Sequence, residues 1–164
     1  MKKLLLFCLS LCLLVSCSQI DRLRKAAEKG DANAQFELGY CYYNGTGVAQ
    51  DYEQAVGLFR KAAEQGNVDA QLNLGFCYLA GLGVTNDDTQ AIYWYRKAAE
   101  QGLSMAHLSL AFYYEAANDS NTALFWLEKA VENRDGKLPD SERWKEKVNE
   151  LKAEGFSSSL AKID

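Results

Sequence analysis

The stretch Lys25-Ala26-Ala27-Glu28-Lys29-Gly30 decides the fold of this chain, because the chain repeats it twice. It returns as Lys-Ala-Ala-Glu-Gln-Gly at residues 61–66 and again at residues 97–102, with a spacing of 36 residues each time. Three further sets of residues keep the same spacing, namely Ala34, Ala70 and Ala106; Leu38, Leu74 and Leu110; and Tyr40, Phe76 and Phe112. A fixed period of this length indicates supersecondary units that stack on one another.

The periodicity within one unit is helical. Ala34, Leu38 and Cys41 stand at i, i+4 and i+7, which places them on one face of a helix. A second helix is predicted to begin at Asp51, with Gln54 three residues on as in a capping box, and Asp87 and Gln90 repeat that arrangement. Glycine follows each second helix, where a left-handed cap is expected, at Gly30, Gly66 and Gly102.

Two such helices cannot bury their apolar faces alone, so the units must stack. We therefore predict an all-α solenoid of stacked antiparallel helix pairs with terminal capping helices. A last helix is expected after Pro139-Asp140-Ser141, with Trp144, Val148 and Leu151 on its apolar stripe and Gly155 at its end. The predicted organisation begins with a signal at 1–16, followed by a tether and the start of a capping helix at 17–25. Repeats are predicted at 26–61, 62–97 and 98–129, of which the last is shortened. Capping helices at 130–155 and a loose tail at 156–164 complete the predicted organisation.

The first residues indicate export. Lys2 and Lys3 precede an apolar run of twelve residues, 4–15, which is too short to span a bilayer and is typical of a secretory signal. The sequence Leu14-Val15-Ser16-Cys17 resembles the lipobox of bacterial lipoproteins. That resemblance implies lipid attachment to Cys17 and a mature chain that begins there, held in a membrane by several acyl chains.

An ordinary cleaved signal with an incidental cysteine is the alternative. Cys8 and Cys12 follow large residues and would leave with the signal. The resemblance to lipoproteins also implies sorting to the outer membrane, facing the periplasm, because Ser18 is the second residue of the expected mature chain. Of the 18 Lys and Arg residues, two leave with the signal, so 16 stand against 22 Asp and Glu, a net charge of −6. This acidic balance argues against nucleic acid as a partner.

The repeated motifs carry a family resemblance. Ala34-Gln35-Phe36-Glu37-Leu38-Gly39, Gly45-Thr46-Gly47-Val48 and Phe59-Arg60-Lys61-Ala62-Ala63-Glu64 resemble a Sel1-like repeat, and the second unit matches as well. The third unit departs, because it has Ala111 in place of the glycine and lacks the Gly-x-Gly-Val loop. Its turn should be tighter and closer to that of a tetratricopeptide repeat.

Similarity to helical solenoids implies that the first helix of each unit lines a concave, partner-binding face. Nine candidate residues stand at positions of the first helices that vary between units, and Gln35, Gln71 and His107 share one further polar position. Together they give the candidate groove: Asn33, Gln35, Glu37, Tyr43, Asp69, Gln71, Asn73, Leu79, Met105, His107, Ser109 and Glu115. Three units make a short groove, so we expect a peptide segment or a modest interface with a protein of the cell envelope. We favour a monomer.

The pattern does not predict catalysis, a metal or a cofactor. Gly45-Thr46-Gly47 and Gly81-Leu82-Gly83 lack the preceding strand of a phosphate-binding loop and are interpreted as turns. His107 has no acid or thiol nearby that would make it a base or ligand. We expect packing roles for the aromatic residues that recur in register, which are Tyr40, Phe76, Phe112, Phe59 and Tyr95, together with Trp94 and Trp126.

Cys41 and Cys77 stand one repeat apart. Stacked helices lie about 8–10 Å apart, whereas a disulfide needs Cα atoms within about 7 Å. We therefore expect two buried free thiols. A cysteine-rich branch of the Sel1-like proteins, reported to bind or hydrolyse β-lactams, has two cysteines in every repeat, whereas this chain has one in two repeats and Tyr113 in the third. A hydrolase or binder of β-lactam or peptidoglycan-like substrates is thus the alternative function, with Ser104, Ser109 and His107 as its only local candidates.

Overall fold

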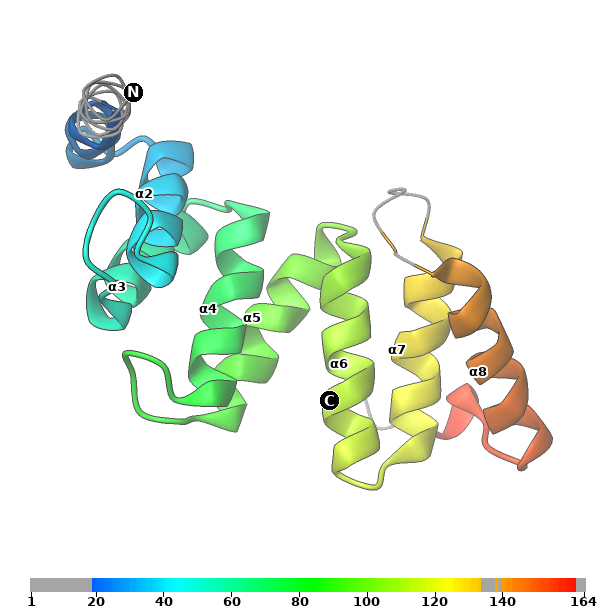
Figure 1. Ribbon diagram of the computed structural model, residues 1–164. Coiled ribbons are helices and arrows are strands. Elements are labelled where there is room, and N and C mark those ends of the chain that lie inside the picture. Colours follow the sequence, from blue (N-terminus) through cyan, green and yellow to red (C-terminus); the bar gives the residue numbers. More distant parts are fainter. Residues whose placement is uncertain (1–18, 134–137, 139, 162–164) are drawn as a thin grey trace, which may run out of the picture. The chain divides into compact units, whose positions relative to one another are not determined.

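The computed structural model describes residues 19–133, 138 and 140–161 (Figure 1), which form helices and no β-strand. The predicted signal at 1–16 and Cys17 lie outside the described residues. The helices span residues 19–28, α2 Ala32–Asn44, α3 Tyr52–Glu64, α4 Val68–Ala80, α5 Asp88–Glu100, α6 Ser104–Ala116, α7 Ser120–Glu132 and α8 Ser141–Ala153, followed by the 3-10 helix η1 Ser158–Leu160. Within this part of the chain, no helix has both the length and the apolar character needed to cross a bilayer.

The chain divides into two compact units, residues 1–88 and 89–164. In the first unit, α3 packs against both α2 and α4. The hairpin of α2 and α3 is antiparallel, because the rings of Tyr43 and Tyr52 meet at its loop end, with centroids 5.3 Å apart, while Phe36 lies 5.9 Å from Phe59 further along. Buried alanines let the helices approach closely, at Ala34, Ala55, Ala62, Ala63 and Ala70.

The predicted caps are present in the first unit. The Asp51 carboxylate accepts hydrogen bonds from the backbone N–H and the side-chain amide of Gln54, both at 3.0 Å. Asp31 and Asn67 cap α2 and α4 in the same way. The glycines that follow the helices, Gly30 and Gly66, have φ of +91° and +89°. These contacts satisfy backbone groups that a helix end leaves unpaired.

The second glycine loop lies directly on the start of α3. At Gly83, φ is +67°, and a Cβ atom would stand 2.2 Å from the carbonyl oxygen of Tyr52. Only a residue without a side chain allows the two backbones to come this close. The Gly-x-Gly sequence here is therefore a turn after α4 that lies against the backbone of the preceding hairpin.

In the second unit, α6 and α7 form the last hairpin, and α7 also packs against α8 and η1. The α6–α7 turn contains Asn118 in the left-handed conformation, with φ of +59°, whereas the left-handed residues in the loop between α2 and α3 are Gly45 and Gly47. The turn is shorter than the loop between α2 and α3, as the shortened third unit predicted.

The predicted loose tail is wrong where the structure describes it. The N–H of Ser157 donates to the side chain of Asn121 on α7 at 2.9 Å, and η1 packs against the same helix. Polar contacts of this kind leave no periodic apolar pattern, so they could not be predicted from the spacing of residues. Residues 162–164 lie outside the described part.

The prediction that the recurring aromatic residues pack in the core is also wrong for three of them. Tyr40, Phe76 and Phe112 are 49, 43 and 47% exposed, while Phe59 and Tyr95 are 0 and 2% exposed. Recurrence shows that two residues occupy the same place in successive units. It does not show whether that place faces another helix or solvent.

Candidate interaction site

Three of the twelve predicted groove residues are structural. Gln35 and Gln71 are buried, and each side-chain amide donates to the carbonyl of the preceding second helix, at Ala27 and Ala63 respectively, over 3.1 Å. His107 is buried as well, with its Nδ1 3.1 Å from the carbonyl oxygen of Leu103. Their predicted place on an exposed groove is therefore wrong. The two glutamines instead tie each hairpin to the helix before it.

The other predicted residues of the first unit lie at or near the surface of α2 and α4. The side-chain oxygen Oδ1 of Asn33 accepts a hydrogen bond from the side-chain amide of Asn67 at 3.0 Å, and the side-chain amide of Asn73 donates to the backbone carbonyl of Asp69 at 2.8 Å. The side chain of Glu37 is exposed, and Asp69, Asn73, Tyr43 and Leu79 are half-buried. These positions can meet a partner, and their role in binding stays a prediction.

In the second unit, Met105 and Ser109 are half-buried and Glu115 is exposed. The Ser109 hydroxyl donates to the carbonyl of Met105 within the helix, at 2.9 Å. Glu115 pairs with Lys147 of α8 at 3.5 Å. Among the predicted residues of this unit, Glu115 alone lines the pocket described next.

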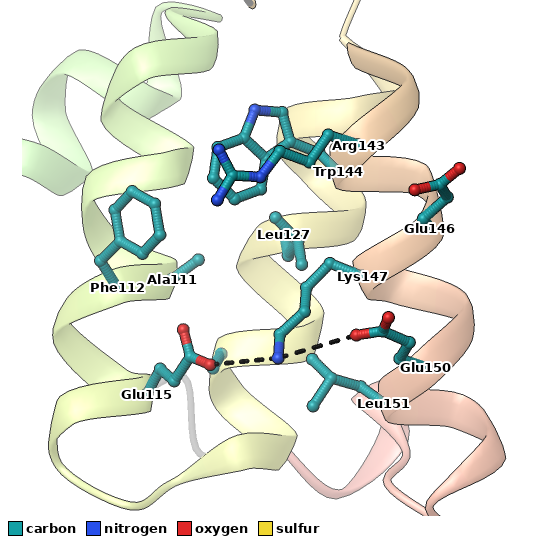
Figure 2. Close-up of a pocket in the computed structure, with 11 residues that line it drawn as sticks. Ala111, Phe112, Glu115, Leu127, Arg143, Trp144, Glu146, Lys147, Glu150 and Leu151 are labelled. Atoms are coloured by element: carbon teal, nitrogen blue, oxygen red, sulfur yellow. Dashed lines mark ion pairs between the residues drawn. The ribbon is translucent and has the colours of Figure 1, made fainter. Parts of the chain in front are cut away.

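A pocket of about 510 Å³ lies between α6, α7 and α8 (Figure 2). Its apolar part is formed by Ala111, Ala123, Leu127 and Leu151. The rings of Phe112 and Trp144 meet edge to face at one end, with centroids 5.4 Å apart. At the other end the Lys147 ammonium lies between Glu115 and Glu150, at 3.5 and 4.0 Å. The arrangement suits an amphipathic side chain or a short segment.

The pocket was not predicted, because Trp144, Val148 and Leu151 stand alike on the apolar stripe of the last helix. Val148 and Leu151 are buried, but Trp144 is only half-buried and lines the pocket. A signal did exist in the sequence. A tryptophan stands on the last helix where the aligned stripe of each repeat begins with alanine.

The side chains considered for chemistry are poorly placed for it. Ser104 is fully buried, His107 is buried, and the Ser109 hydroxyl is bonded within its own helix. Cys41 and Cys77 are free thiols. Burial raises the pKa of Cys77 to about 11. The pKa of Cys41 is raised mainly by burial and to a lesser extent by the negative charge of Glu37. Cys41 is half-buried rather than fully buried. Within the described ranges, no group of three or more metal-ligating side chains is found.

Comparison with known proteins identifies the repeat. The model of the Sel1 repeat matches residues 32–67, 68–103 and 104–135, which together form most of the chain. The comparison with curated proteins gave no match.

Solved structures share this architecture. A Sel1 repeat protein from Oxalobacter formigenes is 33% identical with a TM-score of 0.74, over 85% of this chain and 56% of that one. A protective antigen of uropathogenic Escherichia coli strains, displaying an SLR fold, is 34% identical with a TM-score of 0.66, over 83% and 33%. The cysteine rich protein B of Helicobacter pylori is 33% identical with a TM-score of 0.51, over 53% and 65%.

The chain thus spans less than two thirds of the length of each of these proteins. The predicted all-α solenoid of antiparallel helix pairs is confirmed by the repeat match and by these structures.

Proposed function

The chain belongs to the Sel1 repeat family, and from that premise we propose that it is a lipid-anchored protein of the bacterial cell envelope that holds a protein partner. Its role is that of a scaffold or adaptor, and the first helices of the repeats provide the binding face. The family match supports an interaction module in general. The lipid anchor, the envelope location and the binding face are the specific parts of the proposal.

The observation that carries the binding face is the recurrence of exposed aromatic residues. Tyr40 on α2, Phe76 on α4 and Phe112 on α6 occupy equivalent positions, and each leaves close to half of its surface in solvent. Each ring therefore keeps surface that a partner can cover. Aromatic side chains contribute strongly to protein interfaces, where they bury a large area at little cost in conformational entropy.

Site-specific photocrosslinking in cells tests this face. A photoreactive residue placed at Phe76 should capture a protein that the same residue at Glu64, exposed on α3, does not capture. Substitution of Tyr40 by Ser should then weaken capture from position 76. Equal capture from positions 64 and 76, or capture that Tyr40→Ser leaves unchanged, would contradict a partner on the first helices.

The resemblance of residues 14–17 to a lipobox supports the anchor. Cys17→Ala should abolish labelling by a fatty-acid probe and release the chain from membranes, because the acyl chains provide the membrane affinity. Cys12→Ala is the matched control and should leave labelling unchanged. Labelling that persists in the Cys17 variant would refute the anchor, and fractionation of the labelled protein would test the predicted outer-membrane location.

Binding rather than catalysis is the role we infer for the groove. Ser104 and His107 lie on the same helix and are both buried, so a substrate on the surface cannot reach them as nucleophile and base. Turnover of a β-lactam or a muropeptide by the purified chain, abolished by His107→Ala, would overturn this inference in favour of the hydrolase alternative.

A further inference from the structure

The pocket between α6, α7 and α8 exists because the last hairpin lacks rings that the first hairpin has. In the first hairpin the buried ring of Phe59 lies beside Gly39, and its centroid is 6.3 Å from that of Tyr43. The repeat register places Leu127 at the position of Phe59, and Glu115 at that of Tyr43. Both replacements line the pocket. Space that aromatic rings fill in the first hairpin is therefore open in the last one.

The capping helix keeps this space open. Trp144 begins the apolar stripe of α8, where α2, α4 and α6 have buried alanines. An indole ring cannot be buried in the volume that an alanine fills, so Trp144 stays half-buried. Its edge rests against Phe112 of α6 and forms the aromatic end of the pocket (Figure 2).

The charges around the pocket are unequal at its two ends. Lys147 is matched by two carboxylates, those of Glu115 and Glu150. At the aromatic end, the Arg143 guanidinium lies over the Trp144 ring, 5.2 Å from its centroid. Arg143 has no carboxylate partner among the residues that the structure describes. In Figure 2 it extends across Trp144 toward α6. Glu146 also lines the pocket, and no ion pair joins it to Arg143 in the described part of the chain.

We propose that this pocket binds a segment of the protein partner that carries an apolar side chain next to an acidic residue. The apolar side chain enters between Phe112, Leu127 and Leu151, and the neighbouring carboxylate pairs with Arg143. Burial of a large apolar side chain supplies the main attraction, and a guanidinium stacked on an aromatic ring retains its donors for a carboxylate. This inference rests on the proposed function, because it takes a protein partner as given.

The probe is a pair of capped octapeptides, Gly-Ser-Gly-Phe-Asp-Gly-Ser-Gly and the same peptide with Lys in place of Asp, each with fluorine on the phenylalanine ring. They are added to the full chain, purified in detergent, and the fluorine resonance is followed by NMR. Broadening of that resonance reports burial of the phenylalanine itself. We expect the Asp peptide to bind at least about fivefold more tightly than the Lys peptide. The carboxylate of the Asp peptide can pair with Arg143, whereas the ammonium of the Lys peptide is repelled by it.

Two sets of variants locate the binding. Ala111→Gly with Leu127→Phe rebuilds the glycine and ring of the first hairpin, and filling the pocket should weaken binding by about tenfold or more. Arg143→Gln should weaken binding of the Asp peptide by about fivefold. Lys145→Gln removes the same charge from an exposed position of α8 that does not line the pocket, so it should leave binding unchanged. Arg143 and Lys145 are exposed, so these two variants test the proposal even if the filled-pocket variant folds poorly.

The outcomes separate this proposal from the proposed function. Broadening that disappears on filling the pocket and depends on Arg143 supports it. Absence of broadening at about 10 mM peptide, or equal effects of Arg143→Gln and Lys145→Gln, would overturn it. Capture of a partner from position 76 that the filled pocket leaves intact would also overturn it while the proposed function stands. Self-association of the chain that Leu127→Phe abolishes would show that a second copy occupies the pocket.

Discussion

The first and last hairpins are built from helices of the same length, yet they pack by different means. Helices α2 and α3 have thirteen residues each, as do α6 and α7. In the first hairpin a helix glycine, Gly39, faces a buried ring, whereas the last hairpin has Ala111 and Leu127 at these two positions. The glycine and the ring change together because a Cβ atom at Gly39 would stand 2.9 Å from the Phe59 ring. The change from glycine to Ala111 is thus matched by a smaller side chain, Leu127, at the position that faces it.

The turns of the hairpins give the largest expected difference in stability. We expect Gly83→Ala to lower the free energy of unfolding by about 3 kcal/mol or more, because its Cβ would collide with the backbone of Tyr52 and φ is positive. In the last hairpin, Asn118→Gly should change it by less than about 1 kcal/mol, because that turn already adopts the left-handed conformation. Urea denaturation followed by circular dichroism measures both. Similar losses of unfolding free energy in the two variants would show that the loop between α4 and α5 is no more constrained than the turn between α6 and α7.

The helix glycine gives the next largest effect. Gly39→Ala should cost about 2 kcal/mol through overpacking against Phe59, whereas Ala111→Gly should cost about 1 kcal/mol through helix propensity alone. Adding Phe59→Leu to Gly39→Ala should recover part of the loss, with a coupling energy of about 1 kcal/mol in a double-mutant cycle. If the losses from Gly39→Ala and Phe59→Leu were simply additive, the two positions would not be energetically coupled.

A third difference concerns how each hairpin is tied to the next helix. Arg60 of α3 donates to the Tyr78 hydroxyl of α4 at 2.8 Å, and Glu128, at the equivalent place in α7, pairs with Lys152 of α8 at 2.7 Å. Burial alone would raise the pKa of Glu128, but hydrogen bonds from Lys152 and Ser158 outweigh it and lower the pKa below its ordinary value of 4.5. Because the folded pKa is depressed, this contribution is present above the unfolded pKa and is lost as the pH falls through the folded value.

We therefore expect Glu128→Gln to cost about 1 kcal/mol at neutral pH and progressively less below pH 4.5. Arg60→Gln is the comparison, and its cost should not decline over the same range, because the contact between Arg60 and Tyr78 contains no carboxylate. Denaturation curves at several pH values distinguish the two. A cost of Glu128→Gln that is independent of pH would show that the ion pair with Lys152 contributes nothing.

The smallest expected effect concerns the exposed aromatic residues. Phe76→Ser should change the free energy of unfolding by no more than about 0.5 kcal/mol, as is usual for a surface position. Phe112→Ser should cost about 1 kcal/mol, because it removes the edge-to-face contact with Trp144. Thermal melting of the two variants gives the comparison. A large loss for Phe76→Ser would restore the packing role that the sequence suggested.

Much of the candidate site could not be predicted from one sequence. Variation between units selected Glu37, Asp69 and Glu115, which do lie at or near the surface. The aligned polar position added Gln35 and Gln71, although their amides are buried and bonded to backbone carbonyls. A polar side chain on a helix can face solvent or satisfy a buried carbonyl, and sequence spacing is the same in both cases.

The sequence by itself determined the repeat, the helix pairs, their caps and the position of the shortened unit, because these depend on local spacing and on residues that act on their own backbone. Asp51 caps its helix through Gln54 three residues away, and Gly30 ends one through its own φ. Only the tertiary structure decided that Tyr40 and Phe76 face solvent while Phe59 does not, and that Leu127 and Trp144 line a pocket. These properties depend on which side chains meet across neighbouring helices, and a period along the chain does not carry that information.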